Sequence, residues 1–248
     1  MRISKVLPAV ALALAGIAAL FFAVAPLGTR LGWWHYRFGL YWLMPAAGFI
    51  GAAAAVHSGL ALTTRWQRFR IQGRVMLCLA LTIGLAVAYV PWRYHVIRAA
   101  LPPIHDLSTN TENPPTFEAV LPARAAENAS GVAYDNPQLP HMQKQAYPDL
   151  APLIVPLPVA KAFDLALEVA RAMPGWTIVA VDPGRGRIEA SQQSLWYGFT
   201  DDISIRVTCD GGGSRIDMRS TSRQGRSDYG VNAARIRGYM AALRRRIG

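Results

Sequence analysis

Residues 75–92, VMLCLALTIGLAVAYVPW, determine how this chain is organised. The stretch has eighteen residues without a charged side chain, ends in Trp92 next to Pro91, and is followed at once by Arg93. An uncharged run of this length can cross a bilayer as a helix, and tryptophan beside arginine is typical of the membrane–water interface. We interpret it as the last membrane-spanning helix, after which the chain leaves the bilayer.

Two further apolar runs, residues 6–27 and 38–62, precede this stretch. The second run is rich in glycine and alanine, which suits close packing of helices in lipid. The first could instead be a signal peptide, because residues 23–25 (AVA) resemble a cleavage site. It is long for such a signal, and Pro26 would follow the cut, so we favour an uncleaved helix. The sequence therefore predicts three transmembrane helices in a membrane domain of residues 1–101.

The basic residues of this domain indicate its orientation. Residues 1–105 hold ten Lys or Arg and no Asp or Glu, whereas the 16 basic and 15 acidic residues that follow nearly cancel. The excess charge lies in short loops between apolar runs, which favours a lipid bilayer as partner and disfavours nucleic acid. With the N-terminus inside, six basic residues lie inside (Arg2, Lys5, Arg65, Arg68, Arg70, Arg74) and four outside (Arg30, Arg37, Arg93, Arg98). We predict a multi-pass inner-membrane protein with a cytoplasmic N-terminus and a periplasmic C-terminal domain.

Residues 102–151 form a proline-rich connector without a sustained helical or strand period. A flexible linker would be polar, but this one contains Phe117, Tyr134 and Tyr147. We expect an extended strap that lies on the folded domain, with one helical turn near residues 142–146.

Residues 152–248 predict a small α+β domain. Alternating strands and one amphipathic helix are followed by a final helix from about Asp228. The expected strands are residues 153–157, 176–181, 187–193, 202–209 and 216–221, with the first helix opened by Pro158 and ended by Pro174 and Gly175. The order β-α-β-β-β-β-α, with short turns, predicts a mainly antiparallel sheet with two helices on one face.

The hairpin at residues 210–213, DGGG, constrains the register of its two strands. A two-residue turn at Gly211 and Gly212 pairs Val207 with Ile216 and places Arg206 opposite Asp217. A longer loop would set Arg206 against an arginine, which costs stability. We therefore predict the short turn.

A polar concentration between the last strand and the last helix is the main candidate site. It consists of Arg223, Arg226, Ser227, Asp228 and Asn232. The two arginines and the helix N-terminus could bind an anionic group. Alternatively, Ser227 or Asp228 caps the helix, and the arginines pair with carboxylates such as Asp201 or Asp202. We favour this second reading, a structural clasp, and predict that at least one of the two arginines pairs with a carboxylate.

An aromatic loop carries Trp196, Tyr197 and Phe199, and two roles remain open for it: insertion into lipid or a pocket wall, or a part of the core. The triple arginine at residues 244–246 is interpreted as favourable charge at a helix C-terminus rather than a lipid-binding patch. No histidine or cysteine has the spacing of a metal ligand set, so we expect neither a metal nor another cofactor.

Several separated segments resemble one family. They are residues 222–236 (SRQGRSDYGVNAARI), 104–110 (IHDLSTN), 113–115 (NPP), 146–150 (AYPDL), 173–176 (MPGW) and 198–202 (GFTDD). In their order along the chain, these segments resemble the bacterial domain-of-unknown-function family 1499, in its form with N-terminal membrane spans. That family has no established activity, so the resemblance implies no reaction and no site residues.

These observations favour an envelope protein with a non-catalytic periplasmic domain for binding or scaffolding. Its expected partners are the bilayer and an envelope protein or an anionic envelope component. One alternative is a membrane-anchored enzyme acting on an envelope component, although no general base is evident. The other is an accessory subunit of a transport complex, although the spans contain no acidic residue that would suit ion transport.

Overall fold

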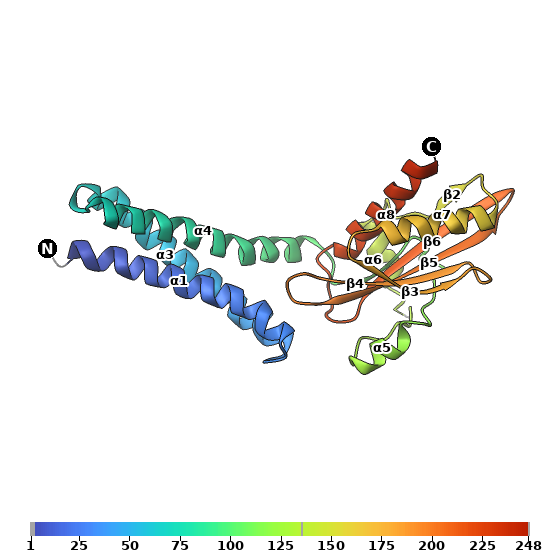
Figure 1. Ribbon diagram of the computed structural model, residues 1–248, viewed down its shortest axis with the longest axis horizontal. Coiled ribbons are helices and arrows are strands. Elements are labelled where there is room, and N and C mark those ends of the chain that lie inside the picture. Colours follow the sequence, from blue (N-terminus) through green and yellow to red (C-terminus); the bar gives the residue numbers. More distant parts are fainter. Residues whose placement is uncertain (1–2, 135, 248) are drawn as a thin grey trace. The chain divides into compact units, whose positions relative to one another are not determined.

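A computed structural model of the chain describes residues 3–134 and 136–247 (Figure 1). It divides into two compact units, which we describe separately. One unit comprises Met1–Ile97 with Trp196–Gly198, and the other comprises Arg98–Leu195 with Phe199–Gly248. Residues 102–151 therefore belong to the same unit as the sheet.

The first unit consists of three long helices that are apolar enough to cross a membrane, as the sequence predicted. They are α1 (Ile3–Arg30), α3 (Met44–Arg65) and α4 (Ile71–Ala100), with the short α2 (Tyr36–Phe38) and a π-helical turn (Gly39–Leu43) before α3 and a 3-10 turn (Trp66–Arg68) after it. The third helix extends beyond the predicted end at Trp92, because Pro91 is accommodated within α4 and the helix continues to Ala100.

Helices α3 and α4 touch through their backbones. A Cβ atom added to Gly84 would lie 2.5 Å from the carbonyl oxygen of Gly51, and one added to Gly51 would lie 2.9 Å from the carbonyl oxygen of Gly84. A Cβ atom added to Gly48 would lie 2.6 Å from the Cγ atom of the Pro91 ring. The glycine-rich second span is therefore explained by a close helix crossing.

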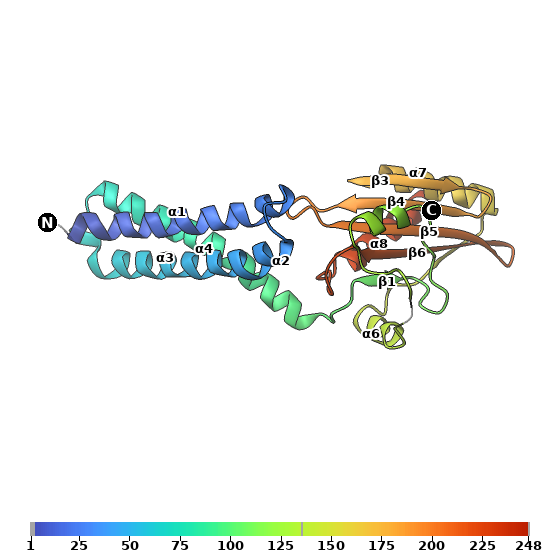
Figure 2. The same cartoon turned by 90° about the horizontal axis from the view of Figure 1, so that it is seen from below.

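The second unit is built on a six-stranded antiparallel sheet, seen from below in Figure 2. The strands are β1 (Asp106–Ser108), β2 (Leu153–Val155), β3 (Trp176–Asp182), β4 (Arg187–Gln193), β5 (Thr200–Asp210) and β6 (Gly213–Ser222). Their order is β1-β6-β5-β4-β3, and β2 pairs with the first half of β6 while β1 pairs with its second half. The strand β1 was not predicted, because three residues inside a proline-rich connector give no detectable period.

The predicted hairpin register is confirmed. Asp210 pairs with Gly213 across the two-residue turn, Val207 pairs with Ile216, and Arg206 pairs with Asp217. The guanidinium of Arg206 donates to Asp217 Oδ2 at 3.0 Å.

The sheet separates two different environments. Helices α7 (Val159–Ala172) and α8 (Val231–Ile247) cover one face, as Figure 1 shows and as the sequence predicted. Under them lies an apolar core whose fully buried members include Ile203, Ile205 and Met218. The opposite face is covered by the strap, which contains the short helix α5 (Leu121–Ala126).

The strap also protects the edge of the sheet. A second strap helix, α6 (Leu139–Ala146), carries the buried Gln143. The side-chain amide of Gln143 donates to the carbonyl of Ser108 at 2.6 Å and accepts from the N–H of Ser108 at 3.0 Å. A glutamine thus replaces a neighbouring strand beside β1, which satisfies backbone groups that an edge would otherwise leave unpaired.

Candidate functional site

Asp202 lies near the start of β5 on the strap-covered face, and its side chain is fully buried. Its Oδ2 accepts from Arg124 Nη1 at 2.7 Å and from Arg223 Nε at 2.9 Å. Its Oδ1 accepts from Arg223 Nη2 at 2.8 Å and from Ser191 Oγ at 2.6 Å. Arg124 belongs to α5 and Arg223 follows β6, so one carboxylate joins the strap to the end of the sheet. The predicted pairing of Arg223 with a carboxylate is confirmed.

This carboxylate remains ionised although it is buried. Burial alone would raise the pKa of Asp202, but hydrogen bonds from Arg223, Ser191 and Arg124 outweigh that effect and lower it. The same carboxylate raises the pKa of Arg223, which also donates to Glu127 in the strap at 2.6 Å. Each charged side chain of this network therefore has an oppositely charged partner, although the buried Nε of Arg124 has no hydrogen-bond acceptor among the described residues.

A second ion pair fixes the strap near β1. Arg219 donates to both carboxylate oxygens of Asp106, at 2.9 and 2.6 Å. Its guanidinium lies over the rings of Phe117 and Tyr134, with 5.0 and 5.1 Å to the ring centroids. Two strap aromatics thus enclose an arginine of the sheet, a cation–π arrangement that excludes water from the pair.

A third contact uses a carboxylate as a helix cap. The buried Glu189 of β4 accepts the backbone N–H groups of Glu118, at 2.8 Å, and Val120, at 3.0 Å. These donors lie just before α5, where backbone N–H groups have no helical partner. Glu189, Asp202 and Arg219 therefore hold the strap on the sheet. From here on, the structural clasp means these three residues and their hydrogen-bond partners, and not the cluster of residues 223–232 considered from the sequence.

Asp201 and Asn232 belong to a different network, on the helix-covered face. Arg235 of α8 donates to Asp201 Oδ2 at 2.6 Å and to Gln192 Oε1 at 2.7 Å. The buried Asn232 accepts from Ser220 Oγ at 2.7 Å and donates to the carbonyl of His105 at 2.9 Å. This network fastens α8 to the sheet.

Asp228 caps the beginning of α8, one of the two roles considered from the sequence. Its carboxylate accepts the N–H groups of Gly230 at 3.0 Å and of Asn232 at 2.7 Å. Burial raises the pKa of Asp228, although these two hydrogen bonds act in the opposite direction. Ser227 Oγ accepts the N–H of Tyr229 at the longer distance of 3.4 Å.

The candidate residues therefore do not form the single cluster that the sequence suggested. Side chains of consecutive strand residues point to opposite faces, so Asp201 and Asp202 serve different networks. Arg223 joins the strap-covered side, Asn232 joins the helix-covered side, and the side chain of Arg226 is exposed.

Several partners in these networks were not predicted from the sequence: Arg124, Asp106, Arg219, Glu189 and Arg235. One signal was available, because the outward-facing set of β6 is charged and the strap that follows the spans contains aromatic residues. That combination indicates a covered polar face, but it does not indicate which residues pair.

The aromatic loop, residues 194–199, is closed by a pair of hydrogen bonds. The N–H of Ser194 donates to the carbonyl of Phe199 at 2.7 Å, and the N–H of Phe199 donates to Ser194 Oγ at 2.9 Å. Trp196 is 41% exposed and the neighbouring Leu195 is 86% exposed, whereas Tyr197 is buried. Leu195 is thus exposed, whereas the ring of Trp196 meets the ring of Phe22 edge to face, with 5.0 Å between the centroids.

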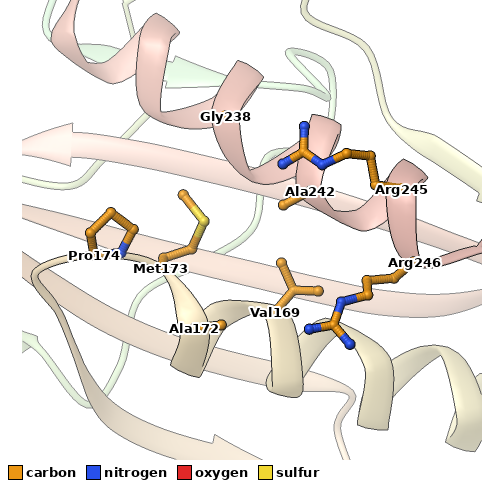
Figure 3. Close-up of a pocket in the computed structure, with 8 residues that line it drawn as sticks. All are labelled: Val169, Ala172, Met173, Pro174, Gly238, Ala242, Arg245 and Arg246. Atoms are coloured by element: carbon orange, nitrogen blue, oxygen red, sulfur yellow. The ribbon is translucent and has the colours of Figure 1, made fainter.

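A groove of about 430 Å³ lies between α7 and α8. Figure 3 shows its lining: Val169, Ala172, Met173, Pro174, Gly238, Ala242, Arg245 and Arg246. The floor is apolar and two guanidinium groups stand at the rim. Arg246 pairs with Glu168 of α7 at 2.8 Å, with both side chains more than half exposed. From the sequence, these arginines were interpreted only as favourable charge at the C-terminus of a helix.

No metal centre emerges in the part of the chain that the structure describes, because none of its His, Cys, Asp and Glu residues form a group of three that could hold an ion.

The family profile described as "protein of unknown function (DUF1499)" matches residues 106–243. The chain belongs to the DUF1499 family. The DUF1499 region begins at β1 and ends within α8, so the strap, the sheet and both covering helices lie inside it. No curated protein and no solved structure matches the chain significantly.

Both the clasp and the α7–α8 groove are thus features of the DUF1499 domain, and the three long helices precede it.

Proposed function

We propose that this DUF1499 protein is an inner-membrane protein whose periplasmic domain binds an anionic envelope component and catalyses no reaction. The observation that carries the proposal is the α7–α8 groove, which combines an apolar floor with arginines at its rim. Such a combination suits a molecule or segment that has both an apolar part and a negative charge.

The rim arginines are available to a ligand. Arg245 is exposed and has no ion pair within the described residues. The bond between Arg246 and Glu168 joins two solvated side chains and contributes about 0–1 kcal/mol, so an incoming anion can replace it. The floor below, formed by side chains such as Val169 and Met173, would contact the apolar part.

The charged groups of the strap-covered face support binding at the groove rather than at that face. Asp202, Arg219 and Glu189 are buried and already hydrogen-bonded to strap or sheet partners. A ligand there would have to displace the strap and leave buried charges uncompensated. These residues are therefore assigned to the structural clasp.

Charge distribution supports the proposed location. The turn between α3 and α4 is the most basic loop of the helical unit, with Arg65, Arg68, Arg70 and Arg74 within ten residues. Positive loops favour the cytoplasmic side. With three spans and this orientation, the DUF1499 domain would lie on the periplasmic side, as we propose.

The test is photocrosslinking of the full-length protein in native membranes. Ala242, inside the groove, is replaced by benzoylphenylalanine, and Gly212, exposed at the β5–β6 hairpin tip, provides the matched control position. We expect an adduct with one anionic envelope component at position 242 only, identified by mass spectrometry. Arg245→Gln combined with Arg246→Gln should abolish it. Equal adducts at both positions, or an adduct unaffected by loss of the arginines, would contradict the proposal.

A further inference from the structure

One end of the sheet gathers three segments that are distant in sequence. β1 begins at Asp106, which pairs with Thr221, and Asp201 near the start of β5 pairs with Ser222. The aromatic loop, which joins β4 to β5, and the turn of residues 223–230, which joins β6 to α8, therefore lie at the end where the chain enters the domain. The N–H of Asp228 in this turn donates to the carbonyl of Ile104 at 3.4 Å.

The connection to the last membrane helix is short. Helix α4 ends at Ala100 and β1 begins at Asp106, a separation that spans at most about 20 Å even when fully extended. From Trp92, an interfacial residue type, the helix rises about 12 Å to Ala100. Connectivity alone therefore keeps this end of the sheet within about 30 Å of the membrane interface.

The opposite end of the sheet is the β5–β6 hairpin. Strand β5 runs from Thr200 to Asp210, so the hairpin is about 33 Å from the aromatic loop. We call the end of the sheet that is joined to α4 the tethered end, and the end at the β5–β6 hairpin the distal end. The two ends can be compared in one experiment.

The tethered end carries the residue types that favour a bilayer interface. Leu195 is 86% exposed and Trp196 is 41% exposed, side by side in a loop closed by hydrogen bonds. Arg226, exposed and without an ion pair among the described residues, lies in the adjacent turn. Tryptophan is favourable at the headgroup level, and an arginine can bind a lipid phosphate bidentately.

We propose that residues 194–199 contact the phospholipid bilayer that holds the three helices, with Leu195 and Trp196 inserted at the interface and Arg226 against lipid phosphates. The contact defines a membrane-facing end of the domain. It is independent of the α7–α8 groove, so it stands or falls separately from the proposed function.

Quenching of a fluorescent probe by spin-labelled lipid tests this contact in the full-length protein in nanodiscs. The chain has two cysteines, Cys78 and Cys209, both exposed. With Cys78→Ser, the remaining Cys209, which lies beside the distal hairpin, carries the control probe. With Cys78→Ser, Cys209→Ser and Leu195→Cys, the probe sits in the aromatic loop. We expect at least threefold stronger quenching by shallow doxyl lipid at position 195 than at position 209.

A second variant checks the role of the apolar side chain. Adding Trp196→Asp to the loop-labelled protein should reduce quenching to the level seen at position 209. Because the ring of Trp196 also contacts the ring of Phe22, the melting curve is recorded in parallel and the comparison is made on folded protein. Absence of quenching at position 195, equal quenching at both positions, or full quenching retained with Trp196→Asp would overturn the proposal.

Discussion

Asp202 holds the strap to the sheet because two arginines converge on one buried carboxylate. Arg124 comes from the strap and Arg223 from the end of β6, and the side chain of Asp202 is 0% exposed. Such a group contributes little net energy when complete, but losing one partner leaves charges buried without compensation.

We predict that Asp202→Asn lowers the free energy of unfolding of the domain by about 3–5 kcal/mol, since two guanidiniums lose their carboxylate. Pulse proteolysis of the full-length protein in urea measures this change. Glu112→Ala is the control, because Glu112 is 86% exposed and lies 3.6 Å from Lys144, a surface pair that should contribute less than about 1 kcal/mol. Equal small effects of both substitutions would show that loss of the Asp202 carboxylate leaves no uncompensated buried charge.

The lowered pKa of Asp202 predicts that the stability of the domain depends on pH. Its pKa is lower in the folded protein than the value near 3.9 that is usual in unfolded chains. The stabilisation is therefore fully present above about pH 4 and is lost as the pH falls through the lower folded pKa. Urea midpoints measured between pH 6 and pH 3 should fall more steeply for the wild type than for Asp202→Asn. Identical slopes would contradict this assignment.

Substitution of Asp228 tests whether this residue is a helix cap or part of a ligand-binding site. We predict that Asp228→Ala lowers the free energy of unfolding by about 1 kcal/mol, because Gly230 and Asn232 lose the acceptor of their N–H groups. The same urea titration measures it. A variant with unchanged stability and correct membrane insertion that has lost its function in cells would instead make Asp228 part of a functional site.

At the scale of elements, the crossing of α3 and α4 depends on glycine. The backbone of Gly84 approaches that of Gly51 so closely that no side chain fits between them. By contrast, a Cβ atom added to Gly59, also in α3, would meet nothing within 4 Å.

We predict that Gly84→Ala destabilises the helical bundle by about 1–3 kcal/mol, since the added methyl forces the helices apart. Gly59→Ala should be neutral or slightly stabilising, because alanine favours the helix. The fraction of full-length protein that stays monodisperse in detergent after heating provides the measurement. Similar heat stability of the two variants would argue against the close crossing.

At the scale of the whole molecule, the six basic residues expected inside and the four expected outside predict the topology. Alkaline phosphatase fused after Asn110 should be active, because that enzyme folds only outside the cytoplasm, and a fusion after Arg70 should be inactive. A reporter that is active only in the cytoplasm, fused at the same positions, is the control. The reverse pattern of activities would place the DUF1499 domain in the cytoplasm.

The sequence by itself determined the features that follow from local period and length. Three helices long enough to span a bilayer, and the alternation along β5 and β6, follow from the spacing of apolar residues. The register that pairs Val207 with Ile216 follows from a two-residue glycine turn, since any odd slip would reverse the buried faces.

Only the tertiary structure decided which face of the sheet each polar side chain occupies and what covers it. Asp201 and Asp202 are neighbours in sequence, yet one binds α8 and the other binds the strap. Arg219 and Asp106 are 113 residues apart, and no local pattern links them. An outward-facing charge looks the same in a sequence whether it meets water or a buried partner, because its environment depends on the long-range path of the strap.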